Sequence, residues 1–94
     1  MKEFAFISRH KLTDEQRALA KHAGVNLTEV GDANAFDANQ VLKLVSGYSG
    51  AVVVHPAAAM ILRNKNYSVG VFENGSRANE GEKPSFFASQ FHIF

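Results

Sequence analysis

Cysteine is absent from this chain of 94 residues. Its absence excludes disulfide bonds, thiolate metal sites and cysteine nucleophiles from the chemistry of the protein. Four histidines are present, but no HxH or HExxH spacing joins them, so the sequence offers no metal-binding pair. The glycine-rich P-loop and GxGxxG motifs that hold common nucleotide cofactors are missing as well. We therefore expect neither a metal ion nor another cofactor.

Excess charge and long apolar runs are also missing. Ten basic and nine acidic side chains leave a net charge of +1 with neutral histidines, so no global basic field exists to hold duplex DNA. No apolar run approaches the roughly 20 residues that a membrane-spanning helix needs. Arg9 and His10 interrupt the apolar opening residues too early for a secretory signal peptide. We expect a cytoplasmic protein that binds neither duplex DNA nor a membrane.

The composition that remains is that of a folded protein. Hydrophobic residues make up 46% of the chain and charged residues 20%, as in ordinary globular domains. The length predicts a single domain over residues 1–94. Because a chain of this size buries only about 60–65% of its unfolded surface, a homodimer would add stability, and we expect one.

The apolar pattern alternates between the two-residue period of strands and the 3.6-residue period of helices. Strands are expected at residues 4–8, 26–30, 52–54, 67–72 and 86–93, with Phe87, Phe91 and Ile93 on one face of the last. Helices are expected at residues 13–23 and 56–64 and between residue 37 and the glycines at 47 and 50, and an exposed loop at 73–85. This order predicts an α/β fold: a small, three-layer, Rossmann-like domain. Its sheet should have about five mostly parallel strands, with an antiparallel C-terminal strand.

Two of the expected helices begin with a capping signal. Thr13 followed by Gln16, and Asp37 followed by Gln40, have the spacing of a capping box, in which each side chain bonds the other residue's backbone N–H. The second helix then carries one apolar stripe, formed by Val41, Leu44, Val45 and Tyr48.

The most informative segment runs from the valines at 52–54 into a helix that begins with Pro56. The valines predict a strand buried on both faces, and the fixed φ of proline suits the first turn of a helix. Ala57 and Ala58 follow with almost no side-chain bulk, so free backbone N–H groups and His55 would face whatever lies above the sheet. We expect an anion pocket here.

Other polar residues follow the expected strands, and parallel sheets bind ligands beyond the carboxyl ends of their strands. Arg9 is suited to clamp a phosphate with two hydrogen bonds. His10 and His55 are the candidate catalytic residues, because histidine exchanges protons near neutral pH. The complete set of candidate ligand-binding residues is Ser8, Arg9, His10, Asp32, His55, Ala57, Ala58, Asn74 and Ser76.

Each candidate also has a structural interpretation. Arg9 and His10 fit a solvated loop, and His55 fits a residue that only satisfies the entry of a helix. Asp32 follows a glycine, as turn residues do, and Asn74 with Gly75 is a common turn pair. His22 and His92 are expected to be structural or surface residues.

The string from Ile7 to Gln16, ISRHKLTDEQ, resembles the opening of small CRISPR-associated proteins related to the CARF domain. Some of these proteins have a strand, a histidine and then a helix that opens on leucine-threonine-x-glutamate-glutamine. The order of elements is similar too. The resemblance implies a homodimer that binds cyclic oligoadenylates, and in some members cleaves them as a ring nuclease. It supplies no residue-by-residue catalytic assignment.

Three functional hypotheses follow, the third less favoured than the others. The first is a homodimer that binds a nucleotide second messenger, such as a cyclic oligoadenylate, with metal-independent phosphodiester cleavage as a further activity. The second is a non-enzymatic interaction protein of phage or plasmid type that inhibits a defence complex. The loop expected at 73–85 and the apolar final strand would supply its contact face. A third, less favoured option is an enzyme acting on another phosphate-bearing metabolite.

Overall fold

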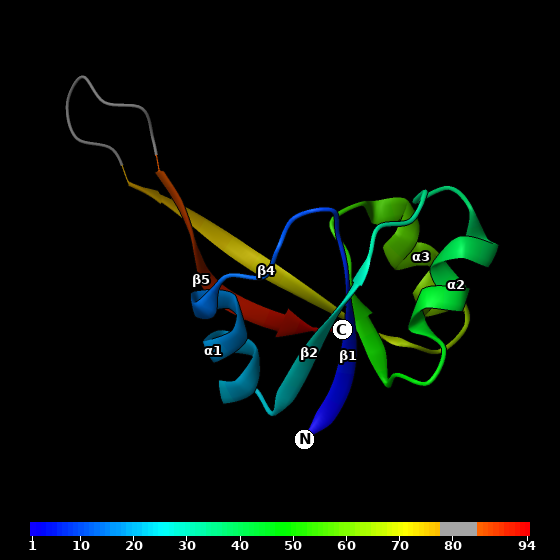
Figure 1. Cartoon of the computed structure of the whole chain (residues 1–94), viewed down its shortest axis with the longest axis horizontal. Helices are drawn as coiled ribbons and strands as arrows, with labels where there is room; N and C mark the ends of the chain where they lie inside the picture. The colour runs from blue at the N-terminus through cyan, green and yellow to red at the C-terminus, as the bar shows by residue number, and fades with distance from the viewer. Residues whose placement is uncertain (78–84) are drawn as a thin grey trace.

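The computed structural model describes the backbone of residues 1–77 and 85–94, and the side chains of residues 1–73 and 90–94. It is an α/β fold with one five-stranded sheet in the order β2-β1-β3-β4-β5 (Figure 1). The strands are β1 (Lys2–Ile7), β2 (Val25–Gly31), β3 (Gly50–Val52), β4 (Ser68–Arg77) and β5 (Ser85–Ile93). The helices are α1 (Asp14–His22), α2 (Ala38–Val45) and α3 (Pro56–Asn64). The first four strands pair in parallel and β5 pairs antiparallel with β4, which confirms the predicted fold class.

Alternate residues of β1 supply the cores on the two faces of the sheet. Phe4 and Phe6 pack on one face, toward α1, in a cluster that also holds Ala20. Ala5 and Ile7 pack on the other face, in a cluster that α2 and α3 cover. Figure 1 shows α1 on one side of the sheet and α2 with α3 on the other. Burial on both faces explains why β1 is apolar at every position from residue 4 to 7.

The capping signals are confirmed in full for α1 and in part for α2. Thr13 accepts the Gln16 N–H at 3.1 Å, and the Gln16 side chain accepts the Thr13 N–H at 3.0 Å. Asp37 caps α2 by accepting the N–H groups of Asn39 and Gln40. Gln40 does not return the bond, because the Asp37 N–H donates to the Asn34 carbonyl instead. The second capping box is therefore wrong, although its N-cap is right.

Two elements end earlier than predicted. The valine strand, expected at 52–54, is β3 at Gly50–Val52; Val53 is buried, but Val54 is 81% exposed. Its partners explain the early end, because β3 pairs only with residues 4–6 of β1 and 68–70 of β4. Helix α2 ends at Val45, so Tyr48 lies outside it but still packs against the core.

The predicted loop at 73–85 is wrong at both ends. β4 continues to Arg77 and β5 begins at Ser85, so Asn74 and Gly75 lie in a strand ladder and form no turn. β3 stops before this part of β4. Beyond that point β4 and β5 continue as a hairpin that projects from the body (Figure 1). A hairpin outside the core does not need apolar residues, which is why its polar sequence suggested a loop. The predicted orientation of Phe87 lies outside the described side chains.

Within the described residues, no helix has the length and apolarity needed to cross a membrane.

Candidate functional site

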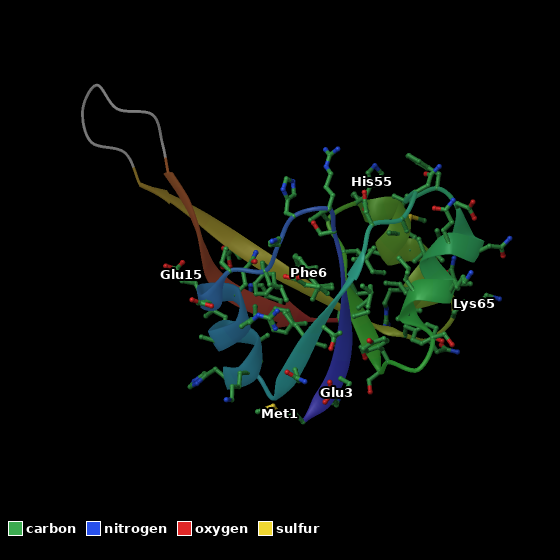
Figure 2. The ribbon with its side chains drawn as sticks, in the orientation of Figure 1. Met1, Glu3, Phe6, Glu15, His55 and Lys65 are labelled. Atoms are coloured by element: carbon green, nitrogen blue, oxygen red, sulfur yellow. The ribbon has the colours of Figure 1, made fainter. Side chains whose placement is uncertain are left out.

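The strand order places a topological switch point between β1 and β3. The chain moves from β1 to β2 on one side and then crosses to β3 on the other, with both strands parallel to β1. In open α/β sheets this point marks the ligand crevice, beyond the carboxyl ends of the strands. Figure 2 shows His55 at this end of the molecule, opposite Met1 and Glu3 at the amino end of β1. The segment after β1 and the segment after β3 therefore leave the same edge from neighbouring strands.

Ser8 fixes the start of the segment after β1. Its N–H donates to the Gly31 carbonyl at 2.8 Å, and its hydroxyl oxygen accepts the His10 N–H at 3.0 Å. The residue is 9% exposed. No hydrogen bond from its hydroxyl hydrogen occurs within the described residues, and as an acceptor it holds the turn that presents Arg9 and His10.

The far end of the same segment is fixed as well. The Leu12 N–H donates to Glu29 Oε1 at 2.7 Å, and the Leu12 side chain packs on the core cluster beneath α1. Thr13 then begins the capping box of α1. Arg9 and His10 are exposed, but they lie on a loop of six residues whose backbone is anchored at both ends. Such a loop loses little conformational freedom when it binds a ligand.

No ion pair among the described side chains neutralises the charge on this loop. The ion pairs among the described side chains are Arg17 with Glu29 and His92 with Glu73. Arg9 takes part in neither, and no hydrogen bond within the described part of the chain engages its guanidinium or the His10 ring. Both side chains are thus available to an external anion.

His55 is held more firmly than the loop side chains. It is the N-cap of α3, and its Nδ1 accepts the Ala57 N–H at 3.0 Å. The ring of Phe36, from the segment between β2 and α2, packs edge-on against the imidazole with the ring centroids 4.9 Å apart. Pro56 occupies the first turn, as predicted.

This capping bond changes what the helix N-terminus can offer. Pro56 has no N–H, Ala57 donates to the His55 ring, and Ala59 donates to the His55 carbonyl at 3.3 Å. Within the described residues, the Ala58 N–H is the first-turn donor without a partner, and the Ala58 side chain is buried in the core. The helix start is therefore less open than the sequence suggested.

The remaining candidates lie apart from these. Asp32 is exposed after β2, on the far side of β1 from β3. Asn74 and Ser76 belong to the β4–β5 ladder, and their side chains lie outside the described residues. The sheet thus brings Ser8, Arg9 and His10 to the same edge as His55.

Phe36 was missed by the sequence analysis. Phe36 is 76% exposed, and its ring contacts the imidazole of His55 at the start of α3. A phenylalanine directly before an N-cap normally indicates packing on its own helix, so the sequence gives no signal for this contact.

No cluster of three or more metal-ligating side chains occurs in the described part of the chain. Compared with known proteins, the sequence matches no family model and no curated protein.

Proposed function

We propose that the chain binds a nucleotide second messenger, of the cyclic oligoadenylate class, at the carboxyl edge between β1 and β3. The observation that carries the proposal is the loop from Ser8 to Thr13, which presents Arg9 and His10 at the same sheet edge as the start of α3, with no side-chain partner among the described residues. Arginine in this setting binds a phosphate through two charge-assisted hydrogen bonds. His55 adds a third polar group from the neighbouring strand.

We further propose that the chain acts as a homodimer, because a two-fold pair presents the same residues twice to a symmetric cyclic ligand. Light scattering at micromolar concentration, with and without cyclic tetra-adenylate, tests this part. A monomer in both conditions contradicts the homodimer.

The same groups are compatible with cleavage of the ligand without a metal ion. In such a reaction the 2′-oxygen of a ribose attacks the adjacent phosphorus, the bond from phosphorus to the 5′-oxygen breaks, and a 2′,3′-cyclic phosphate forms while the 5′-oxygen takes up a proton from water. Arg9 would neutralise the charge on the phosphoryl oxygens, and a histidine would accept the proton of the 2′-hydroxyl. Chromatography of the products after incubation with the protein separates binding from cleavage.

The decisive experiment is calorimetric titration of the full chain with cyclic oligoadenylates and with linear nucleotides. We expect Arg9→Ala to weaken binding by about tenfold or more, because hydrogen bonds to charged groups contribute about 1.5–3 kcal/mol. Arg63→Ala is the matched control, since Arg63 is an exposed arginine in the last turn of α3. No heat with any of these ligands, or equal losses in both variants, contradicts the proposal.

The edge strand β5 favours a second candidate, a non-enzymatic interaction protein of phage or plasmid type. Ile93 at the end of β5 and Phe94 directly after it are 40% and 63% exposed, beside the part of β4 that pairs with β3. Exposed apolar residues on an edge strand are typical of contact surfaces. Affinity purification from a host lysate that yields no stoichiometric partner contradicts this candidate.

A further inference from the structure

The hydrogen bond between Ala57 and His55 determines where the imidazole proton lies. The Ala57 N–H donates to Nδ1 at 3.0 Å, so Nδ1 must hold a lone pair and no proton. In a neutral imidazole the single proton is then on Nε2, which becomes a donor. The two nitrogens of His55 therefore have different and fixed roles.

The surroundings of His55 also restrict its conformation. Phe36 contacts the ring with an interplanar angle of 66°, and Pro56 restricts the backbone of the residue before it, which is His55. A flip of the imidazole would break the bond to Ala57. The residue is exposed, so Nε2–H is the polar group that it presents to a ligand.

We infer that His55 caps α3 through Nδ1 and donates a hydrogen bond to the ligand through Nε2, and that it is not the proton acceptor of any cleavage. The ligand half of this inference rests on the proposed function. His10 is left as the candidate proton acceptor at this edge, because its ring has no partner among the described residues. The sequence alone had given the two histidines the same catalytic role.

The capping half can be tested without a ligand. In the ¹⁵N-labelled full chain near neutral pH, we expect a scalar coupling across the hydrogen bond from the Ala57 amide nitrogen to His55 Nδ1. We also expect the proton on Nε2 in the imidazole spectrum. A proton on Nδ1, or no coupling to Ala57, overturns the assignment.

Two variants separate the cap from the donor. His55→Asn keeps a side-chain oxygen that accepts the Ala57 N–H, as asparagine does at N-caps, but it has no group at the position of Nε2. His55→Ala removes both. We expect His55→Asn to melt close to the wild type and His55→Ala to melt at a lower temperature. Both should bind cyclic tetra-adenylate about tenfold more weakly, as expected for the loss of one hydrogen bond to a charged group.

The outcomes distinguish this inference from the proposed function. Wild-type affinity in His55→Asn overturns donation by Nε2, even if the wild-type chain binds the probe well. If the wild type does not bind the probe, the proposed function and the donor role of Nε2 are both overturned. The scalar coupling between Ala57 and His55 still tests whether Nδ1 caps α3. If the chain cleaves the probe, we expect the loss in His55→Asn to fall on KM. A drop in kcat of about a hundredfold or more would instead identify His55 as the proton acceptor.

Discussion

Gly50 and Gly70 lie where neighbouring strands leave no room for a side chain. A Cβ at Gly50 would collide with the carbonyl oxygen of Ser68, which belongs to the backbone of β4. A Cβ at Gly70 would lie 2.7 Å from the ring of Phe91 and 2.9 Å from a methyl group of Val52. A Cβ at Gly50 would meet backbone, which cannot move, whereas a Cβ at Gly70 would meet the outer atoms of side chains. The two sites should therefore differ in how well they tolerate a larger residue.

We therefore predict that Gly50→Ala destabilises the fold more than Gly70→Ala. Overpacking at Gly70 should cost about 1–3 kcal/mol, because the half-buried Phe91 ring can shift. Urea denaturation measures both variants, and Phe91→Leu in the Gly70→Ala background should recover part of the loss. Equal midpoints for the two single variants would contradict this account.

At the level of elements, the loop from Ser8 to Thr13 depends on a bond from β2. Glu29 accepts the Leu12 N–H and also lies 3.8 Å from Arg17 on α1. We predict that Glu29→Ala raises the hydrogen-exchange rate of the Leu12 amide by about fivefold, as expected for losing one exposed hydrogen bond. The released loop should also weaken the binding that we assign to Arg9.

Glu3→Ala is the control for that variant. Glu3 is also an exposed carboxylate that bonds a neighbouring residue, with Asn26 Nδ2 at 2.9 Å from its Oε2, but it lies at the opposite end of β1 (Figure 2). Its loss should leave the Leu12 amide unchanged. If both variants alter Leu12 exchange alike, the effect is general destabilisation, and Glu29 does not specifically hold the loop.

The elements that could be predicted from the sequence are those with local signals. Thr13 with Gln16 marked the start of α1, and Pro56 marked the start of α3, because caps and first turns depend on residues only a few positions apart. The ends of β3 and β4 depend on pairing with distant strands. No local pattern indicates that β3 pairs only as far as Val52, or that β4 continues to pair with β5 as far as Arg77.

The candidate site shows the same division. Strand ends followed by polar residues predicted that Arg9, His10 and His55 share an edge, and the parallel order of β1 and β3 places them there. The contact of Phe36 with His55 joins segments far apart in the chain and could not be predicted. The capping bond between His55 and Ala57 joins residues only two positions apart. The sequence pattern nevertheless favours an open N–H group at Ala57, because a histidine N-cap is unusual.

For the molecule as a whole, the two core clusters share the same central strands. Phe4 lies in the cluster beneath α1 and its neighbour Ala5 lies in the cluster beneath α2 and α3, and both are 0% exposed. A substitution that loosens the packing of one cluster should therefore also destabilise the other, because both contain residues of β1. The two tyrosines of the chain, Tyr48 and Tyr67, both pack on the α2 and α3 side, so their fluorescence reports on that cluster.

We predict that Phe4→Leu, on the α1 side, lowers the unfolding midpoint of tyrosine fluorescence and of far-ultraviolet circular dichroism by the same amount. The loss should be about 1–3 kcal/mol, because the substitution removes buried ring atoms and leaves part of their volume unfilled. Leu62→Ala, on the α3 side, is the matched variant, since Leu62 is also 0% exposed. Coincident curves in both variants mean one cooperative unit. If Phe4→Leu shifts the circular dichroism curve and leaves the tyrosine curve in place, the two faces unfold separately. The loop from Ser8 to Thr13, which connects β1 to α1, would then open together with the α1 face. β3 and the start of α3, where His55 lies, would stay folded.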